Sequence, residues 1–134
     1  MNYMLDTNIC IYIIKKHPAS VFKKFFSFPI GTVCVSSITF SELMYGAEKS
    51  LHIEKNKAAL EEFFLPIDII PFNDEAARHY GYIRASLEKQ GTPIGSLDLM
   101  IAAHAQSLKM TLVTNNTREF SRVPKLPLEN WVES

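Results

Sequence analysis

The chain has 134 residues, and its 14 lysines and arginines balance 14 aspartates and glutamates, so net charge favours no class of partner. This length fits one domain with a real core. The chain contains no run of about 18 uncharged apolar residues, and no basic segment precedes an apolar one at the N-terminus. We therefore expect neither a membrane span nor a signal peptide.

Short apolar runs alternate along the chain with helical patterns. Such alternation predicts a parallel sheet covered by helices on both faces, because parallel strands need crossover helices. The expected fold is a single α/β domain over residues 1–134, an α/β/α sandwich. The expected strands are 3–5, 32–36, 67–70, 110–114 and 126–128, and the expected helices are 9–16, 19–26, 37–50, 53–65, 75–90 and 96–105.

Two of these helices have informative patterns. The helix at 96–105 is rich in small and apolar residues, which predicts burial close to the sheet. His104 follows Asp98 by six residues and so points away from it, which favours a structural role. The helix at 75–90 should bury one face, formed by Ala77, Tyr80, Ile83 and Leu87.

Asp6 directly follows the first apolar run and directly precedes a helical pattern. In open α/β sheets, ligands bind at the carboxyl ends of the strands, where Asp6 is expected to lie. A purely structural explanation is also available, since an aspartate before a helix can cap it by accepting a bond from a free backbone amide.

Glu42 and Asp98 have the same two explanations. Thr39 and Glu42 have the spacing of a capping box, and Asp98 lies in a first turn, where the helix dipole favours an anion. Both acids also lie at strand-to-helix or helix-start positions that meet at one edge of a parallel sheet. Three unpaired carboxylates that converge there would repel one another unless a divalent cation lay between them. Mg²⁺ suits such an oxygen-only site.

Two segments are basic although the chain is neutral. Residues 15–24 contain four lysines and no acid, and residues 109–125 contain four basic residues and one acid. These segments fit either a phosphate-binding face or ordinary solvated surface. Next to a carboxylate-held metal, they suggest phosphodiester chemistry.

Four motifs in the right order make the sequence resemble the PIN-domain ribonucleases, and most of all the VapC toxins of bacterial toxin–antitoxin modules. Each motif is weak alone, but the ordered set covers nearly the whole chain. The motifs are Met4-Leu5-Asp6-Thr7-Asn8, Ser37-x-x-x-Ser41-Glu42-Leu43-x-x-Gly46, Pro93-Ile94-Gly95-x-x-Asp98-x-x-Ile101-Ala102-x-His104-Ala105 and Leu112-Val113-Thr114-Asn115-Asn116-x-x-Glu119-Phe120.

The resemblance implies an endoribonuclease that depends on Mg²⁺ or Mn²⁺ and inhibits translation and growth in the bacterial cytoplasm. It implies Asp6, Glu42 and Asp98 as catalytic metal ligands. It also implies a VapB-type antitoxin, a homodimer, operator DNA bound only through the antitoxin, and possible cleavage of initiator tRNA in the anticodon stem-loop.

The resemblance also suggests supporting residues. Thr7 and Asn8 would orient the metal ligands, with Thr114 as a further helper. Many family members carry a fourth acid where this chain has Asn116, which leaves a second metal position open, and Glu119 is a candidate replacement. An antitoxin groove is suggested by apolar residues on the early helices, although Ile13 and Leu43 are better explained as core. The candidates are Ile9, Ile13, Phe22, Phe26, Leu43 and Met44.

Two other functions fit parts of the sequence. A haloacid-dehalogenase-like phosphatase also opens with an aspartate after the first strand, but it needs a second aspartate where this chain has Asn8, and a lysine that we cannot place. A catalytically silent PIN-like interaction module would keep the fold without the metal. The intact set of Asp6, Glu42 and Asp98 argues against it.

Overall fold

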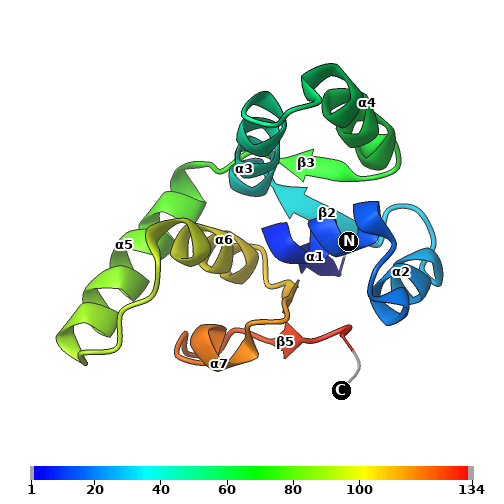
Figure 1. Cartoon of the computed structure of the whole chain (residues 1–134). Coiled ribbons are helices and arrows are strands. Elements are labelled where there is room, and N and C mark those ends of the chain that lie inside the picture. The colour runs from blue at the N-terminus through cyan, green and yellow to red at the C-terminus, as the bar shows by residue number, and fades with distance from the viewer. Residues whose placement is uncertain (1, 133–134) are drawn as a thin grey trace.

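The computed structural model describes residues 2–132, so the expected domain ends at residues 1 and 134 lie outside the described part. Within that part, five strands form one parallel sheet in the order β3-β2-β1-β4-β5 (Figure 1). The parallel sheet is as predicted. The strands are β1 (Tyr3–Leu5), β2 (Val33–Ser36), β3 (Asp68–Ile70), β4 (Thr111–Val113) and β5 (Leu128–Glu129).

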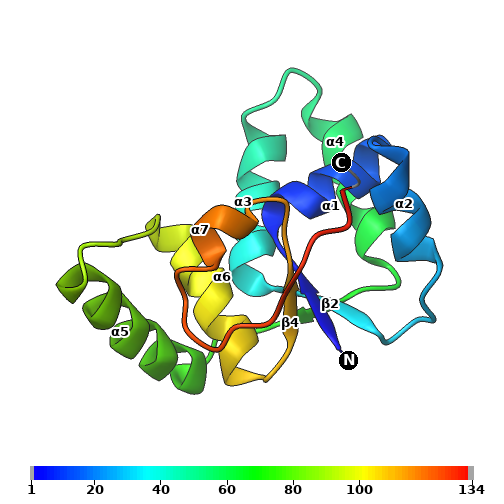
Figure 2. The ribbon, with the colours of Figure 1, turned by 90° about the horizontal axis from the view of Figure 1, so that it is seen from below.

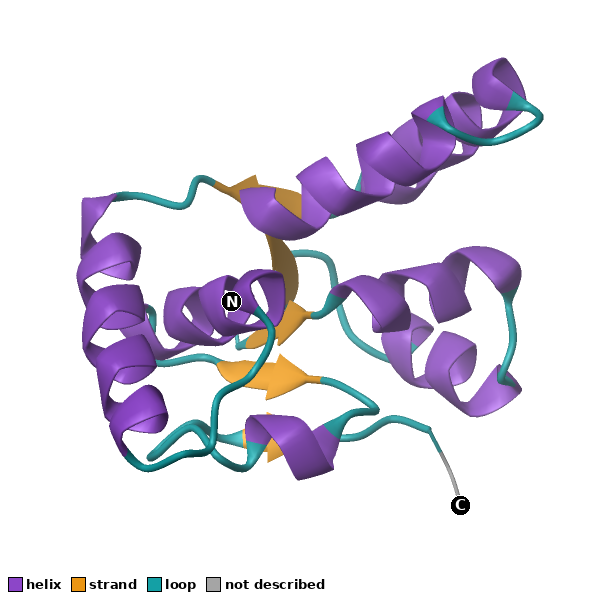
Figure 3. Cartoon of the chain, turned by 60° about the vertical axis from the view of Figure 1, so that its left-hand side comes forward, coloured by secondary structure: helices purple, strands orange, loops and turns teal. Residues whose placement is uncertain are grey.

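Helices cover both faces of the sheet, which confirms the expected α/β/α layering (Figure 3). Figures 1 and 2 show α5 and α6 on one side of the strands and α1 and α2 on the other. Across residues 2–132, no helix is long and apolar enough to cross a bilayer. The helices are α1 (Thr7–Lys15), α2 (Ala19–Phe26), α3 (Ser37–Glu48), α4 (Ile53–Phe64), α5 (Asp74–Lys89), α6 (Ser96–Ser107) and α7 (Thr117–Phe120).

The strands divide the interior into two apolar cores. Successive strand residues point to opposite faces, so Met4 joins the core under α5 and α6, whereas Leu5 joins the core under α1 to α4. Leu112 and Val113 of β4 divide in the same way. The three inner strands β1, β2 and β4 are therefore buried on both sides, as near-continuous apolar runs in a parallel sheet require, whereas the edge strand β3 is largely exposed.

The long helix α5 departs slightly from its predicted face. Ile83 and Leu87 are buried and Tyr80 is half-buried against the same core, as expected. The fourth core position is Ala76, however, and Ala77 is exposed, so the prediction for Ala77 is wrong. The reason is the helical period: positions 76, 80, 83 and 87 share one face of the helix, whereas position 77 lies beside that face.

Candidate functional site

Asp6 lies at the end of β1, the central strand, with β2 on one side and β4 on the other. The chain crosses from β1 to β2 in one direction and reaches β4 in the other, so Asp6 lies at a topological switch point, where open α/β sheets bind ligands. Its Oδ1 accepts a 2.9 Å hydrogen bond from the Ile9 amide, so the residue is also the N-cap of α1. Capping and site position thus coexist at this residue.

The Asp6 carboxyl is difficult to ionise where it lies. Its side chain is 5% exposed, and burial is the main cause that raises its pKa from 3.8 to about 6. Hydrogen bonds from the Thr114 hydroxyl and the Ile9 amide lower the pKa, whereas the negative charges of Asp98 and Glu42 raise it further. Thr114, predicted as a helper, therefore contacts Asp6 directly, and its hydrogen bond stabilises the ionised form of the Asp6 carboxyl.

Glu42 lies on α3 and reaches toward α1. The Thr7 hydroxyl donates a 2.7 Å hydrogen bond to Glu42 Oε1, across 35 residues of sequence. The capping-box explanation for Glu42 is wrong, because α3 begins earlier: Ser36 caps it by accepting a 3.1 Å bond from the Ile38 amide. Thr39 is consequently a buried residue inside the helix, and Glu42 is free to face the site.

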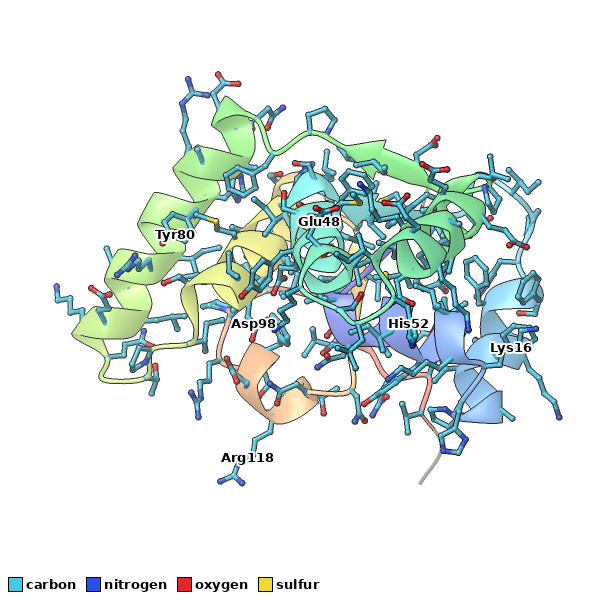
Figure 4. All side chains as sticks on the ribbon, turned by 45° about the horizontal axis from the view of Figure 1, so that its top comes forward. Lys16, Glu48, His52, Tyr80, Asp98 and Arg118 are labelled. Atoms are coloured by element: carbon cyan, nitrogen blue, oxygen red, sulfur yellow. The ribbon has the colours of Figure 1, made fainter. Side chains whose placement is uncertain are left out.

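Asp98 lies in the first turn of α6, as predicted, and in Figure 4 its label lies between α6 and α7. Burial raises its pKa, followed by the negative charges of Glu119 and Glu42. Arg118 on α7 points away from Asp98 in the same view, so it does not offset these charges (Figure 4). The two acids that act on Asp98 come from α3 and α7, so acidic side chains of three separate elements lie close enough to oppose one another's ionisation.

Glu119 is held at the edge of this cluster by α7. Asn116 Nδ2 donates a 2.9 Å hydrogen bond to Glu119 Oε2, and Glu119 Oε1 accepts a 3.3 Å bond from the Gly95 amide, directly before α6. Asn116 thus contributes no charge but fixes the acid three residues later. The arrangement supports Glu119 as the candidate for the missing fourth acid. The orienting role expected for Asn8 stays a prediction, since the described residues form no hydrogen bond with its exposed side chain.

The acidic side chains lie near one another but do not form a ready-made set of metal ligands. Across residues 2–132, no three His, Cys, Asp or Glu side chains stand at ligating distances from one another. Repulsion among carboxylates accounts for such spacing. The available donors are all carboxylate and hydroxyl oxygens, which suits a hard ion such as Mg²⁺ or Mn²⁺. Asp6, Glu42 and Asp98 would hold it.

An apolar groove opens beside the carboxylates, between α1, α3 and α4. Thr7 and Glu42 form its polar end, and Ile11, Ile14 and Leu60 contribute apolar lining. The prediction of Ile9 as a groove residue is wrong, because it is 0% exposed and belongs to the core, whereas Ile13, 3% exposed, is core as preferred.

The other residues proposed for the groove lie in different places. Leu43 is core, as preferred, although it also lines the groove floor. Met44 is half-buried. Phe22 and Phe26 line a second hollow between α1–α2 and α4, and Phe26 is 64% exposed. The buried Asp6 cap at the start of α1 sets which isoleucines face inward, and periodicity alone does not fix that register.

Comparison with known proteins identifies the family. The sequence model of the PIN domain family matches residues 3–126 of the chain. The chain is 51% identical over 131 residues to the tRNA(fMet)-specific endonuclease VapC of Shigella flexneri, covering 98% of both chains. The chain belongs to the VapC ribonucleases of the PIN domain family. The VapC resemblance seen in the four sequence motifs is thereby confirmed.

Other VapC proteins are similarly close. Ribonuclease VapC2 of Haemophilus influenzae is 50% identical over 132 residues, covering 98% of this chain and 99% of the relative. The VapBC structure from Salmonella typhimurium, bound to DNA, contains a chain that superposes with a TM-score of 0.93 at 45% identity, covering 98% of this chain and 99% of that one. VapBC2 from Rickettsia felis, bound to a promoter DNA fragment, gives 0.92 at 45%, covering 98% and 100%.

Proposed function

We propose that the chain is an endoribonuclease that uses Mg²⁺, or Mn²⁺ in its place, bound by Asp6, Glu42 and Asp98. The observation that carries this proposal is the mutual repulsion of these carboxylates at the carboxyl edge of the sheet. Within residues 2–132, no lysine or arginine forms an ion pair with any of them. A divalent cation supplies the positive charge that the protein does not.

A bound divalent cation would lower the pKa of a coordinated water and screen the scissile phosphate. The protein's own contribution is to fix the orientation of the acidic side chains by hydrogen bonds. Thr114 and the Ile9 amide hold Asp6, and Thr7 holds Glu42 by a bond that leaves Oε2 free. Glu119 adds negative charge beside Asp98.

The direct test is cleavage of RNA by the purified chain with Mg²⁺ and with EDTA. We expect cleavage only with the metal, and loss of cleavage in Glu42→Gln and Asp98→Asn variants that remain folded by circular dichroism. Asp68→Asn, an exposed aspartate on β3, is the matched control and should cleave normally. Full activity in either site variant removes that residue from the site, and absent activity in the folded parent chain favours the silent interaction module.

The substrate we propose is initiator tRNA, cut in its anticodon stem-loop. Support comes from the relative named tRNA(fMet)-specific endonuclease, which is 51% identical over almost the whole chain. RNA is usually recognised through exposed loops and shape, so the assay should compare initiator tRNA with elongator methionine tRNA and with a transcript of the isolated anticodon stem-loop. Equal cleavage of both tRNAs would refute this substrate.

The partner we propose is a VapB-type antitoxin whose apolar segment binds the groove between α1, α3 and α4. Apolar lining beside a polar end suits an amphipathic peptide, and the solved relatives are VapBC complexes, two of them on DNA. We expect growth arrest in bacteria that express the chain alone, and rescue by co-expression of the adjacent small gene. Harmless expression of the active chain would contradict the toxin assignment.

The remaining elements of the proposal concern assembly and location. We place the enzyme in the bacterial cytoplasm as a homodimer that contacts operator DNA only through the antitoxin. Sedimentation of the chain with and without antitoxin tests the dimer. A gel-shift assay with operator DNA tests the second point: binding by the toxin alone would contradict it.

A further inference from the structure

A buried polar pair connects the two helices that carry Glu42 and Asp98. His104 on α6 is 1% exposed and Ser36, at the end of β2, is 0% exposed. His104 Nδ1 lies 2.8 Å from Ser36 Oγ, so in either ring tautomer the two share one hydrogen bond. Ser36 Oγ also accepts the Ile38 amide proton and thereby begins α3.

Other contacts lock this pair in place. The edge of the Phe72 ring meets the His104 ring, with centroids 5.5 Å apart, and the Phe72 amide donates a 3.0 Å bond to Ser37 Oγ on α3. Three parts of the chain therefore meet at His104: the end of β2 with α3, the segment after β3, and α6. Burial lowers the pKa of His104, so the ring is neutral near pH 7 and adds no charge to the core.

The position of the pair matters because the acids have no such link of their own. Ser36 lies six residues before Glu42, and His104 lies six residues after Asp98. Within the described residues, the Ser36–His104 bond is the one side-chain hydrogen bond that joins α6 to the β2–α3 junction. Asp98 and Glu42 interact only through their like charges, which push them apart.

We infer that His104 is a positioning residue for the metal centre: its bond to Ser36 fixes α6 against the start of α3 and so sets the separation between Asp98 and Glu42. This inference rests on the proposed function. The alternative is that His104 merely fills the core. The two differ in one measurable respect, because a core-filling residue affects stability, whereas a positioning residue also affects metal affinity.

The expected size of the effect follows from residues that orient metal ligands elsewhere. Removing such partners typically weakens metal binding by about 10- to 100-fold. His104 acts through two helices and does not touch the ligands, so we expect the lower end, about tenfold, for His104→Ala. Asparagine carries a polar atom near the position of Nδ1, and glutamine carries it near Nε2. His104→Asn should therefore keep the bond to Ser36, and His104→Gln should lose it.

The experiment is calorimetric titration of the full chain with Mn²⁺, together with thermal unfolding of each variant. We expect His104→Ala, His104→Gln and Ser36→Ala to bind Mn²⁺ about tenfold more weakly, and His104→Asn to bind like the parent chain. Leu87→Ala is the control, because it removes buried apolar volume under α6 without touching the pair. It should lower the unfolding temperature and leave Mn²⁺ affinity unchanged.

The outcomes separate the two proposals. Unchanged affinity in the histidine variants, with a parent chain that binds Mn²⁺ tightly, overturns the positioning role alone. Equal affinities of His104→Asn and His104→Gln overturn it too, and this comparison decides the matter if His104→Ala does not fold. A folded parent chain that binds no Mn²⁺ overturns the metal centre itself, and the inference with it.

Discussion

Replacement of Asp6 by asparagine should stabilise the metal-free protein while it destroys the metal site. Asparagine keeps the shape of the side chain and an oxygen that can accept the Ile9 amide, and it is as good an N-cap as aspartate. It removes only the buried charge. The change therefore isolates the free energy of ionising this carboxyl inside the protein.

The magnitude follows from the pKa of Asp6, which rises from 3.8 to about 6 on folding. Each pKa unit corresponds to about 1.4 kcal/mol, so ionisation of Asp6 costs the folded state about 3 kcal/mol. The folded acid binds its proton more tightly than the unfolded one. Its contribution to stability is thus fully present below about pH 4, declines as the pH rises, and is lost above about pH 6.

The assay is urea unfolding in EDTA at a series of pH values from 4 to 7.5. Near pH 7, Asp6→Asn should be more stable than the parent chain by about 3 kcal/mol, and the gap should close toward pH 4. Asp68→Asn, on the exposed side of β3, is the control and should follow the parent curve. Mn²⁺ at about 1,000 times its Kd should reverse the order, because at that concentration it adds about 4.1 kcal/mol to the stability of the parent chain alone.

Two results would refute this reasoning. A gap between Asp6→Asn and the parent chain that stays constant with pH would show that burial does not raise the pKa of Asp6. Destabilisation by Asp6→Asn in EDTA at pH 7 would show that the ionised carboxylate is a favourable part of the metal-free fold.

Three more predictions concern the residues around the acids. Because three carboxylates nearly neutralise one divalent ion, we expect one well-occupied Mn²⁺ site; Glu119→Gln should weaken Mn²⁺ binding and Asn116→Asp should tighten it, measured by calorimetry without RNA, and two tight sites in the parent chain would contradict this expectation. Thr7→Val removes the bond to Glu42 and should lower kcat about tenfold, whereas Thr7→Ser should retain most activity; equal kcat values would contradict the role of that bond. Ile14→Glu should abolish rescue by the antitoxin in the growth assay but leave RNA cleavage intact, and continued rescue would show that the groove is not the antitoxin site.

Much of the fold could be predicted from the sequence. The spacing of apolar residues distinguishes strands from helices, and capping residues and prolines mark where these elements begin and end. Pro66 and Pro71 bracket β3, and the small-residue helix α6 proved buried against the sheet. The common location of Asp6, Glu42 and Asp98 could be predicted as well, since the carboxyl ends of parallel strands lie at the same edge of the sheet. Local sequence was sufficient to predict the structure wherever a local pattern had only one structural explanation.

The errors arose where two local patterns competed. Thr39 and Glu42 fit a capping box, but Ser36 caps the helix, and its hydroxyl also bonds to His104, a contact that sequence spacing cannot reveal. Helix α7 was not predicted, because four residues are too few to show a helical period. The Glu119–Gly95 bond, which brings α7 to the site, spans 24 residues and leaves no local pattern.

The division of the inner strands β1, β2 and β4 between two cores has a consequence for cooperativity. Met4 and Leu5 are neighbours in sequence, yet one packs under α6 and the other under α1. Loss of either helical layer therefore exposes one face of the same strands on which the other layer packs, so the two layers depend on a shared sheet. We expect a single all-or-none unfolding transition, with circular dichroism and tryptophan fluorescence changing together. Partly opened forms that keep the acids but lose the groove should not accumulate, so proteases would meet either the whole enzyme or an unfolded chain.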